Sequence, residues 1–131
     1  MKFWTCRAGC DVDASAKVVW TMLTDTRMWP GWGPSITDVD CPTRFIHSGS
    51  RGRVRTLMGA WLPFEITTVH EGRFWSWKVA GVPATGHRVT PSRESNGCRV
   101  EFEIPVWAFP YVLVCKVAAL RIKRLAEEGQ G

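Results

Sequence analysis

The chain lacks the short motifs that identify many enzymes and metalloproteins. It has no Gly-x-Gly-x-x-Gly pattern, no P-loop, no Gly-x-Ser-x-Gly and no Cys-x-x-Cys. Its histidines, His47, His70 and His87, lie in separate segments. These absences argue against a nucleotide-binding loop, a serine-hydrolase site, a redox dithiol and a zinc ribbon. We therefore expect no cofactor and no bound metal.

Long apolar and long basic runs are also absent. The longest apolar stretch, residues 104–115, is shorter than the roughly 20 residues that span a bilayer. Residues 1–10 lack the apolar centre of a signal peptide, and the five cysteines are odd in number and widely spaced. We expect no stable membrane insertion and a cytoplasmic location. The net charge of +5 has its densest cluster at 121–124, where a helix end suits cations, so we expect no nucleic-acid partner.

Tryptophan, in contrast, is abundant, with eight residues against a single tyrosine. Each indole brings about 150–250 Å² of surface that favours burial. A tryptophan-rich core is the plain explanation, and a large cavity with aromatic walls is the alternative. At 131 residues the chain has the length of one domain, which can bury a core without disulfides.

The stretch 11–36 predicts a capped helix followed by a short aromatic one. Asp13 is placed to accept hydrogen bonds from the first amides of a helix over 14–26. The residues at positions i, i+3, i+4 and i+7 form one apolar stripe, which indicates a buried face. This stripe consists of Ala16, Val19, Trp20 and Leu23. Two further indoles, Trp29 and Trp32, fall in a second helix over 28–33 that proline and glycine keep short. We interpret this second segment as a lid over a pocket.

The remaining segments alternate as strands and end in one long helix. Turn residues such as Gly72 separate the strands, and Asn96-Gly97 predicts a tight hairpin. The final helix begins near Phe109 and ends near Glu128. The predicted strands cover residues 3–12, 36–41, 52–59, 62–71, 73–80, 85–93 and 97–105. Consecutive strands joined by short turns indicate an antiparallel sheet, so the fold class is α+β.

The size of such a sheet predicts a hollow. Seven strands at about 4.8 Å spacing make a sheet on the order of 30 Å wide, whereas one helix is only about 10–12 Å across. One helix cannot cover a flat sheet of this width. The sheet must therefore curl around the helix and leave a hollow, unless a second copy covers the open face. We therefore expect the protein to be a monomer or a homodimer.

Three segments carry a resemblance to a known family. These are the helix ASAKVVWTMLTD, the turn MWPGWGPSI, and WSWKVAGVPATGHRV at 75–89, together with the long helix after an apolar strand. They resemble the START-like (SRPBCC, helix-grip) superfamily, and within it a bacterial branch of the polyketide cyclase/dehydrase and lipid-transport group. The resemblance covers nearly the whole chain. It implies a single START-like ligand-binding domain over 1–131, with a curved seven-stranded sheet wrapped around the C-terminal helix and two short helices between strands 1 and 2. It also implies a deep cavity for apolar ligands, and it carries over no catalytic residues.

The candidate pocket combines the inward-facing strand positions with the aromatic segment and the start of the last helix. His87 shares a face with Thr85 and Val89 and could orient a ligand or act as a general base. The alternative is a core histidine whose ring nitrogens are hydrogen-bonded. The predicted pocket residues are Trp29, Trp32, Trp61, Trp75, Trp77, Thr85, His87, Val89, Val100, Phe102, Tyr111 and Val114.

Charged strand residues are expected on the opposite face. Alternation places Arg53, Arg55 and Arg88 outside, where cross-strand ion pairs form. Asp38 and Asp40 share one face of their strand and could form a paired-carboxylate site, but a surface position is preferred.

Three functions remain open from the sequence. The first is binding or transport of a small hydrophobic ligand, lipid-like or aromatic and polyketide-like. The second is a cyclase or dehydratase with His87 as its base. The third is a non-enzymatic module whose apolar face meets a protein partner. The first is preferred because no catalytic set is recognisable.

Overall fold

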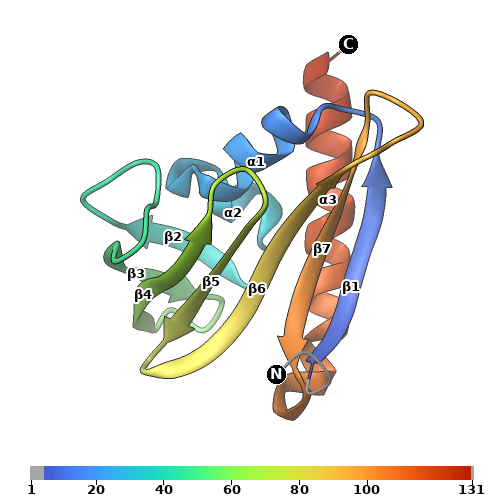
Figure 1. Ribbon diagram of the computed structural model, residues 1–131. Coiled ribbons are helices and arrows are strands. Elements are labelled where there is room, and N and C mark those ends of the chain that lie inside the picture. The colour runs from blue at the N-terminus through green and yellow to red at the C-terminus, as the bar shows by residue number, and fades with distance from the viewer. Residues whose placement is uncertain (1–4, 131) are drawn as a thin grey trace.

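The computed structural model describes residues 5–130 and consists of one curved sheet that wraps around a long helix (Figure 1). The seven strands are antiparallel, in the order β1-β7-β6-β5-β4-β3-β2. The strands are β1 Thr5–Val12, β2 Ile36–Asp40, β3 Arg51–Thr56, β4 Trp61–His70, β5 Phe74–Val79, β6 Val82–Pro91 and β7 Cys98–Pro105. The helices are α1 Ala16–Thr24, η2 Thr26–Met28, α2 Trp29–Trp32, η3 Val106–Tyr111 and α3 Val112–Gln130. The α+β helix-grip prediction is confirmed.

Three β-bulges account for much of the curvature. The register shifts between β2 and β3, between β4 and β5, and between β5 and β6. A bulge puts two residues opposite one, and this bends the strand and increases its twist. All three bulges lie among the strands from β6 to β2, whereas the β1–β7 and β6–β7 pairs are regular. The strands from β6 to β2 therefore curl away from the plane of β1 and β7.

Helix α3 covers only the side of the sheet that β1 and β7 form. It packs on β1 and β7 and also meets α1 and α2 (Figure 1). Its buried face is made largely of small residues, which let the helix approach the sheet closely. These buried residues are Cys115, Ala118, Ala119, Ile122 and Ala126. The inner face of β3, β4 and β5 must be covered by other elements.

Helix α1 begins two residues later than expected from its sequence. Ser15, in an extended conformation, is the N-cap, and its side chain accepts from the backbone N–H of Val18 at 3.2 Å. Asp13 does not cap the helix. Its own backbone N–H donates to the Glu127 carboxylate at 2.8 Å. The predicted stripe is otherwise correct, with Val19 and Leu23 fully buried.

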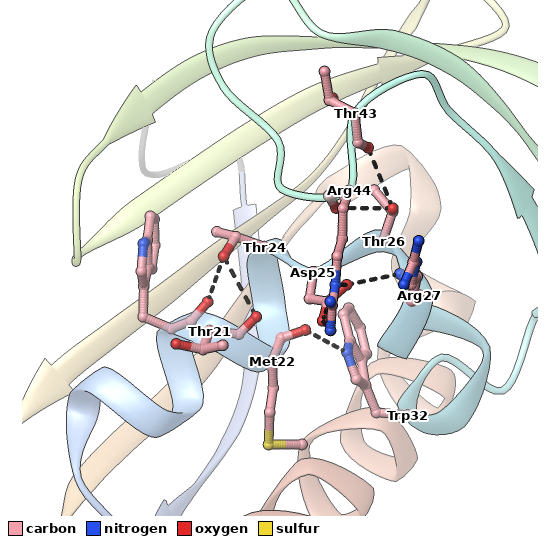
Figure 2. Close-up of polar contacts among 10 residues, drawn as sticks. Thr21, Met22, Thr24, Asp25, Thr26, Arg27, Trp32, Thr43 and Arg44 are labelled. Carbon is pink, nitrogen blue, oxygen red and sulfur yellow. Dashed lines mark hydrogen bonds and ion pairs between the residues drawn. The ribbon is translucent and has the colours of Figure 1, made fainter.

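A buried carboxylate ties the end of α1 to the loop 41–50 (Figure 2). Arg44 donates to both oxygens of Asp25, at 3.2 and 3.0 Å, and the backbone N–H of Arg27 donates to the same carboxylate. The Thr26 hydroxyl donates to the carbonyl of Arg44 at 2.8 Å. Because Asp25 is buried and its oxygens accept these bonds, the turn into α2 has a defined direction.

The two indoles of α2 are fixed by backbone carbonyls of α1. Trp29 Nε1 donates to the carbonyl of Leu23 at 2.9 Å, and Trp32 Nε1 donates to that of Met22 at 3.0 Å. Figure 2 shows the second of these bonds. Both rings are buried, so α2 is an anchored part of the core. The lid over a pocket that the sequence suggested for this segment is not observed, because both indoles pack inside the core.

The predicted tight hairpin at Asn96-Gly97 is wrong, and the last helix begins three residues later than predicted. Residues 92–97 form a longer loop between β6 and β7, in which the Ser92 N–H donates a hydrogen bond to the Gly97 carbonyl at 3.0 Å. A Cβ atom at Gly97 would lie 2.5 Å from the Val12 carbonyl oxygen, so this glycine serves a close approach to β1 and not a tight hairpin. The last helix is also divided, because η3 contains Pro110 and a kink at Ala108 before α3 begins.

Candidate functional site

The inner face of the sheet is closed by a cluster of aromatic rings. Trp29 stacks on Trp75 with centroids 5.5 Å apart and planes at 11°, and Trp77 meets both rings edge-on. Phe64 packs against Trp29 and Trp77. Among the buried side-chain polar atoms of the described residues, the indole N–H of Trp75 is the one that has no hydrogen-bond partner. The rings fill the space beneath the strands, so the hollow expected between sheet and helix is largely absent there.

His87 lies at the centre of this cluster in a directed chain of hydrogen bonds. Trp77 Nε1 donates to the Thr85 hydroxyl at 3.0 Å, and that hydroxyl lies 3.1 Å from His87 Nε2. His87 Nδ1 lies 3.2 Å from the carbonyl of Trp75. A carbonyl only accepts, so Nδ1 carries the proton, and Nε2 accepts from Thr85. Both ring nitrogens of His87 are therefore hydrogen-bonded within the protein, without a ligand.

The environment of His87 also holds the imidazole neutral. Its ring stacks on Trp75 with centroids 3.7 Å apart, and only 2% of the residue is exposed. Burial lowers the pKa of His87 to about 3, against the raising effect of the bond to the Trp75 carbonyl. Of the two roles expected from the sequence, these surroundings favour the structural one, since a base with both nitrogens engaged has no free lone pair.

A small void remains beside the cluster. It measures about 30 Å³, which is room for about one water molecule. Nine of the residues predicted for the pocket line it: Trp29, Trp32, Trp75, Trp77, Thr85, His87, Phe102, Tyr111 and Val114. The sequence therefore identified the residues that meet in the interior, but their side chains leave no space for a sizeable guest.

A much larger volume lies at one end of the sheet. A groove of about 560 Å³, open to solvent, runs between the β3–β4 turn, the strands β5 and β6, and the segment η3. None of the described residues that line this groove is charged. They are Ser35, Ile36, Val54, Thr56, Leu57, Met58, Leu62, Trp77, Val79, Ala84, Thr85, Pro105, Ala108, Pro110 and Tyr111.

The bulge between β5 and β6 shapes the wall of this groove. Ser76 pairs with Gly86 and Lys78 pairs with Pro83, so Trp77 faces both Ala84 and Thr85. Both of these residues line the groove. A regular strand would turn successive side chains to opposite faces, and the small side chain of Ala84 leaves space where a larger one would fill it.

A pair of hydroxyl groups separates the groove from the inner void. The Tyr111 hydroxyl hydrogen-bonds to that of Ser35, and both residues border both spaces. Trp77 and Thr85 also contribute to both walls. Burial raises the pKa of Tyr111, which keeps its phenol protonated. The inner wall of the groove thus offers neutral hydrogen-bonding groups in apolar surroundings.

Three of the predicted pocket residues line neither space. Val89 and Val100 are buried in the core. Trp61 lies on the outer face, because Leu62, Phe64 and Ile66 in the first part of β4 point inward. The Arg53 guanidinium sits 4.6 Å from its ring centroid. The groove residues that sequence reasoning missed come from strand ends, from the β3–β4 turn and from η3. The apolar hairpin tip at Leu57 and Met58 was their one visible signal.

The outer face is polar, as predicted. Arg53 pairs with Asp40 at 3.0 Å, and Arg88 pairs with Glu103 at 3.0 Å.

No group of three potential metal ligands occurs within residues 5–130. Burial raises the pKa of the thiols, to about 11 for Cys98 and about 12 for Cys115, so neither is an activated nucleophile. No helix in the described part of the chain is long and apolar enough to cross a membrane.

Residues 5–128 match the family model described as "Polyketide cyclase / dehydrase and lipid transport". The chain belongs to this family. Its START-like, helix-grip character, expected from the sequence, is confirmed. The family description covers enzymes and carriers alike and agrees with a hydrophobic ligand, and it names no particular one.

Solved structures share this family fold at low sequence identity. The Aha1 dimer of Colwellia psychrerythraea is 16% identical, with a TM-score of 0.73 over 97% of this chain and 98% of the other. XoxI of Bacillus cereus is 13% identical, with a TM-score of 0.72 over 97% and 98%. A protein of Nitrosomonas europaea is 13% identical, with a TM-score of 0.71 over 97% and 96%. At such identities the likeness concerns the fold alone. A comparison with curated proteins found no match.

Proposed function

We propose that this family member is a single ligand-binding domain over 1–131 that binds or carries a small, uncharged, mainly apolar molecule in the end groove. The observation that carries this proposal is the groove of about 560 Å³ whose lining residues bear no charge. Small-molecule sites typically measure about 300–1,000 Å³ and are mostly apolar with a few polar groups. A buried ionic group of a ligand would have no counter-ion in this groove, and its desolvation would oppose binding.

Binding energy would come from apolar contact, and orientation from the inner wall. Burial of apolar surface contributes roughly 25 cal/mol per Å², so about 200 Å² of ligand surface would supply about 5 kcal/mol. The hydroxyls of Ser35 and Tyr111 lie where the groove meets the interior. They suit a hydroxyl or carbonyl at the inner end of a ligand.

Binding is preferred to catalysis because the groove has no acid–base pair. Among the described residues that line it, Tyr111 is the one titratable residue, and its pKa is raised. His87, the base of the cyclase alternative, is neutral and has both ring nitrogens engaged. A cyclase or dehydratase would need a positioned general acid or base that reaches the substrate.

Titration with Nile red, a neutral apolar fluorophore, tests the proposal. We expect saturable binding, and we expect Ala84→Trp to weaken it at least tenfold by filling the groove. The matched control is Thr90→Trp, which adds the same side chain at an exposed position of the same strand. Circular dichroism shows whether each variant is folded. If folded Ala84→Trp bound Nile red as tightly as the wild type, the groove would not be the binding site.

A further inference from the structure

The two ends of the sheet differ in chemistry. At one end the turns 41–50, 71–73 and 92–97 carry charges of both signs, including Arg73 and Glu94. At the other end lie the β3–β4 turn, the β5–β6 turn and the segment η3, at the bottom of Figure 1. The segments of this second end, residues 56–61, 79–84 and 105–111, contain no acidic residue.

The acid-free end exposes large apolar side chains around the mouth of the groove. Met58 is 93% exposed and Leu57 is 71% exposed at the tip of the β3–β4 hairpin. Val82 and Val106, at 45% and 46%, extend the same surface to the next two segments. We call these four residues the rim. Clustered exposed apolar side chains around a cavity mark an interaction surface more often than scattered ones do.

Two unpaired cations flank the rim. Arg55 lies one residue before the β3–β4 turn, and its Nε donates to the Gly59 carbonyl, which folds its side chain over that turn. Lys78 is exposed and pairs in register with Pro83, the second residue of β6. Within residues 5–130 neither of them forms an ion pair, although each has an acidic residue opposite it in register. Asp38, opposite Arg55, accepts from the backbone N–H of Val39, and Glu65, opposite Lys78, pairs with Arg51.

We infer that the rim docks reversibly on the surface of an anionic lipid bilayer, with the groove mouth facing the lipid. The apolar tips would enter the interface, and Arg55 and Lys78 would meet the lipid headgroups. Such a combination of shallow apolar insertion and basic residues is what peripheral membrane binding requires. The net charge of +5 adds a long-range attraction to the same surface.

A second copy of the chain fits the rim less well than a bilayer does. An isologous contact through this end would bring Arg55 and Lys78 toward their own copies, and like charges oppose such a contact. An anionic bilayer supplies the opposite charge and an apolar phase together. Exchange of a ligand between groove and bilayer rests on the proposed function, whereas docking itself needs only the rim.

Co-sedimentation with vesicles tests the docking. The full chain is mixed with vesicles of phosphatidylcholine alone or of phosphatidylcholine with phosphatidylglycerol. We expect binding to the anionic vesicles that weakens as salt rises. Lys78→Glu should weaken it at least fivefold, since one basic residue near an anionic surface contributes about fivefold in affinity. Val82→Asp should have an effect of similar size.

Matched controls separate the rim from general charge attraction. Lys17→Glu makes the same charge change at an exposed position of α1, and Leu120→Asp adds the same carboxylate at a position of α3 that is 46% exposed. Both should retain vesicle binding within twofold. Equal losses in variants and controls, or no binding to anionic vesicles, would overturn the inference. A wild-type dimer in light scattering that Val82→Asp dissociates would also overturn it, because the rim would then be a self-interface.

Nile red titration without vesicles keeps the two proposals distinguishable. Val82 and Lys78 do not line the groove, so their variants should bind Nile red as the wild type does. Vesicle binding with no Nile red binding would reject the groove function and retain the docking surface. Nile red binding with no vesicle binding would do the reverse.

Discussion

The aromatic interior and the end groove lie on the same inner face of one sheet, yet only the groove has room for a guest. In the interior, Trp29 meets Trp75 and Trp77, and the void that remains measures about 30 Å³. In the groove, Val54, Leu62 and Ala84 face an opening of about 560 Å³. The difference shows that the space under a wide curved sheet need not be empty throughout. Large side chains from α2 fill one part, and the absence of a covering helix opens another.

The largest expected effect is on the packed interior. Trp29→Ala should lower the free energy of unfolding by about 3–5 kcal/mol, because it removes a buried indole and leaves a cavity. Urea denaturation followed by circular dichroism measures this loss. Trp61→Ala is the control, since this indole contacts Arg53 on the outer face and should contribute about 1 kcal/mol or less. Similar losses in the two variants would mean that the interior is not packed as described.

The second effect is a pH dependence of stability that arises in the interior and not in the groove. His87 binds a proton near its ordinary pKa of 6.5 in the unfolded chain, but only near about 3 when folded. Its contribution is therefore complete above pH 6.5 and is lost progressively as pH falls toward 3. Between pH 7 and pH 5 the wild type should lose about 2 kcal/mol more than His87→Phe, which cannot titrate. Urea denaturation at both pH values measures the difference, and parallel losses would contradict a neutral buried imidazole.

The third effect concerns the wall between the two regions. Tyr111→Phe and Ser35→Ala should each lower the free energy of unfolding by about 1 kcal/mol, because each breaks the hydroxyl pair. The double variant should lose less than the sum of the two single losses, as expected for residues in direct contact. Thermal or urea denaturation of the four proteins completes the cycle. Strict additivity would show that the pair does not hold the wall.

The smallest effect on stability is expected at the groove mouth. Met58→Ala should change the free energy of unfolding by no more than about 0.5 kcal/mol, because the side chain is almost fully exposed. The affinity of the Met58→Ala variant for Nile red should nevertheless fall about fivefold, because the variant loses apolar contact worth roughly 1 kcal/mol. A variant that lost stability but kept its Nile red affinity would reverse the contrast between groove and interior.

The sequence predicted the elements and the inward faces better than it predicted the space between them. Alternation along β5 and β7 placed Trp75, Trp77 and Phe102 correctly on the inner face. Trp61, by contrast, lines neither space, because it directly precedes the inward-facing Leu62 and one residue along a strand reverses the face. Asp13 and Ser15 are both good helix caps by type, and only the packing of the chain selects Ser15.

By itself, the sequence predicted the antiparallel pairing of consecutive strands and most of the residues that meet inside the sheet, because hydrophobic periodicity and turn residues act locally along the chain. It also carried the three segments whose resemblance pointed to the family. The tertiary structure alone decided where the free volume lies. It placed the α2 indoles against Trp75 and Trp77, and it turned Ala84 inward at a bulge. Free volume depends on how side chains from distant segments fit together, and no local pattern in the chain encodes that fit.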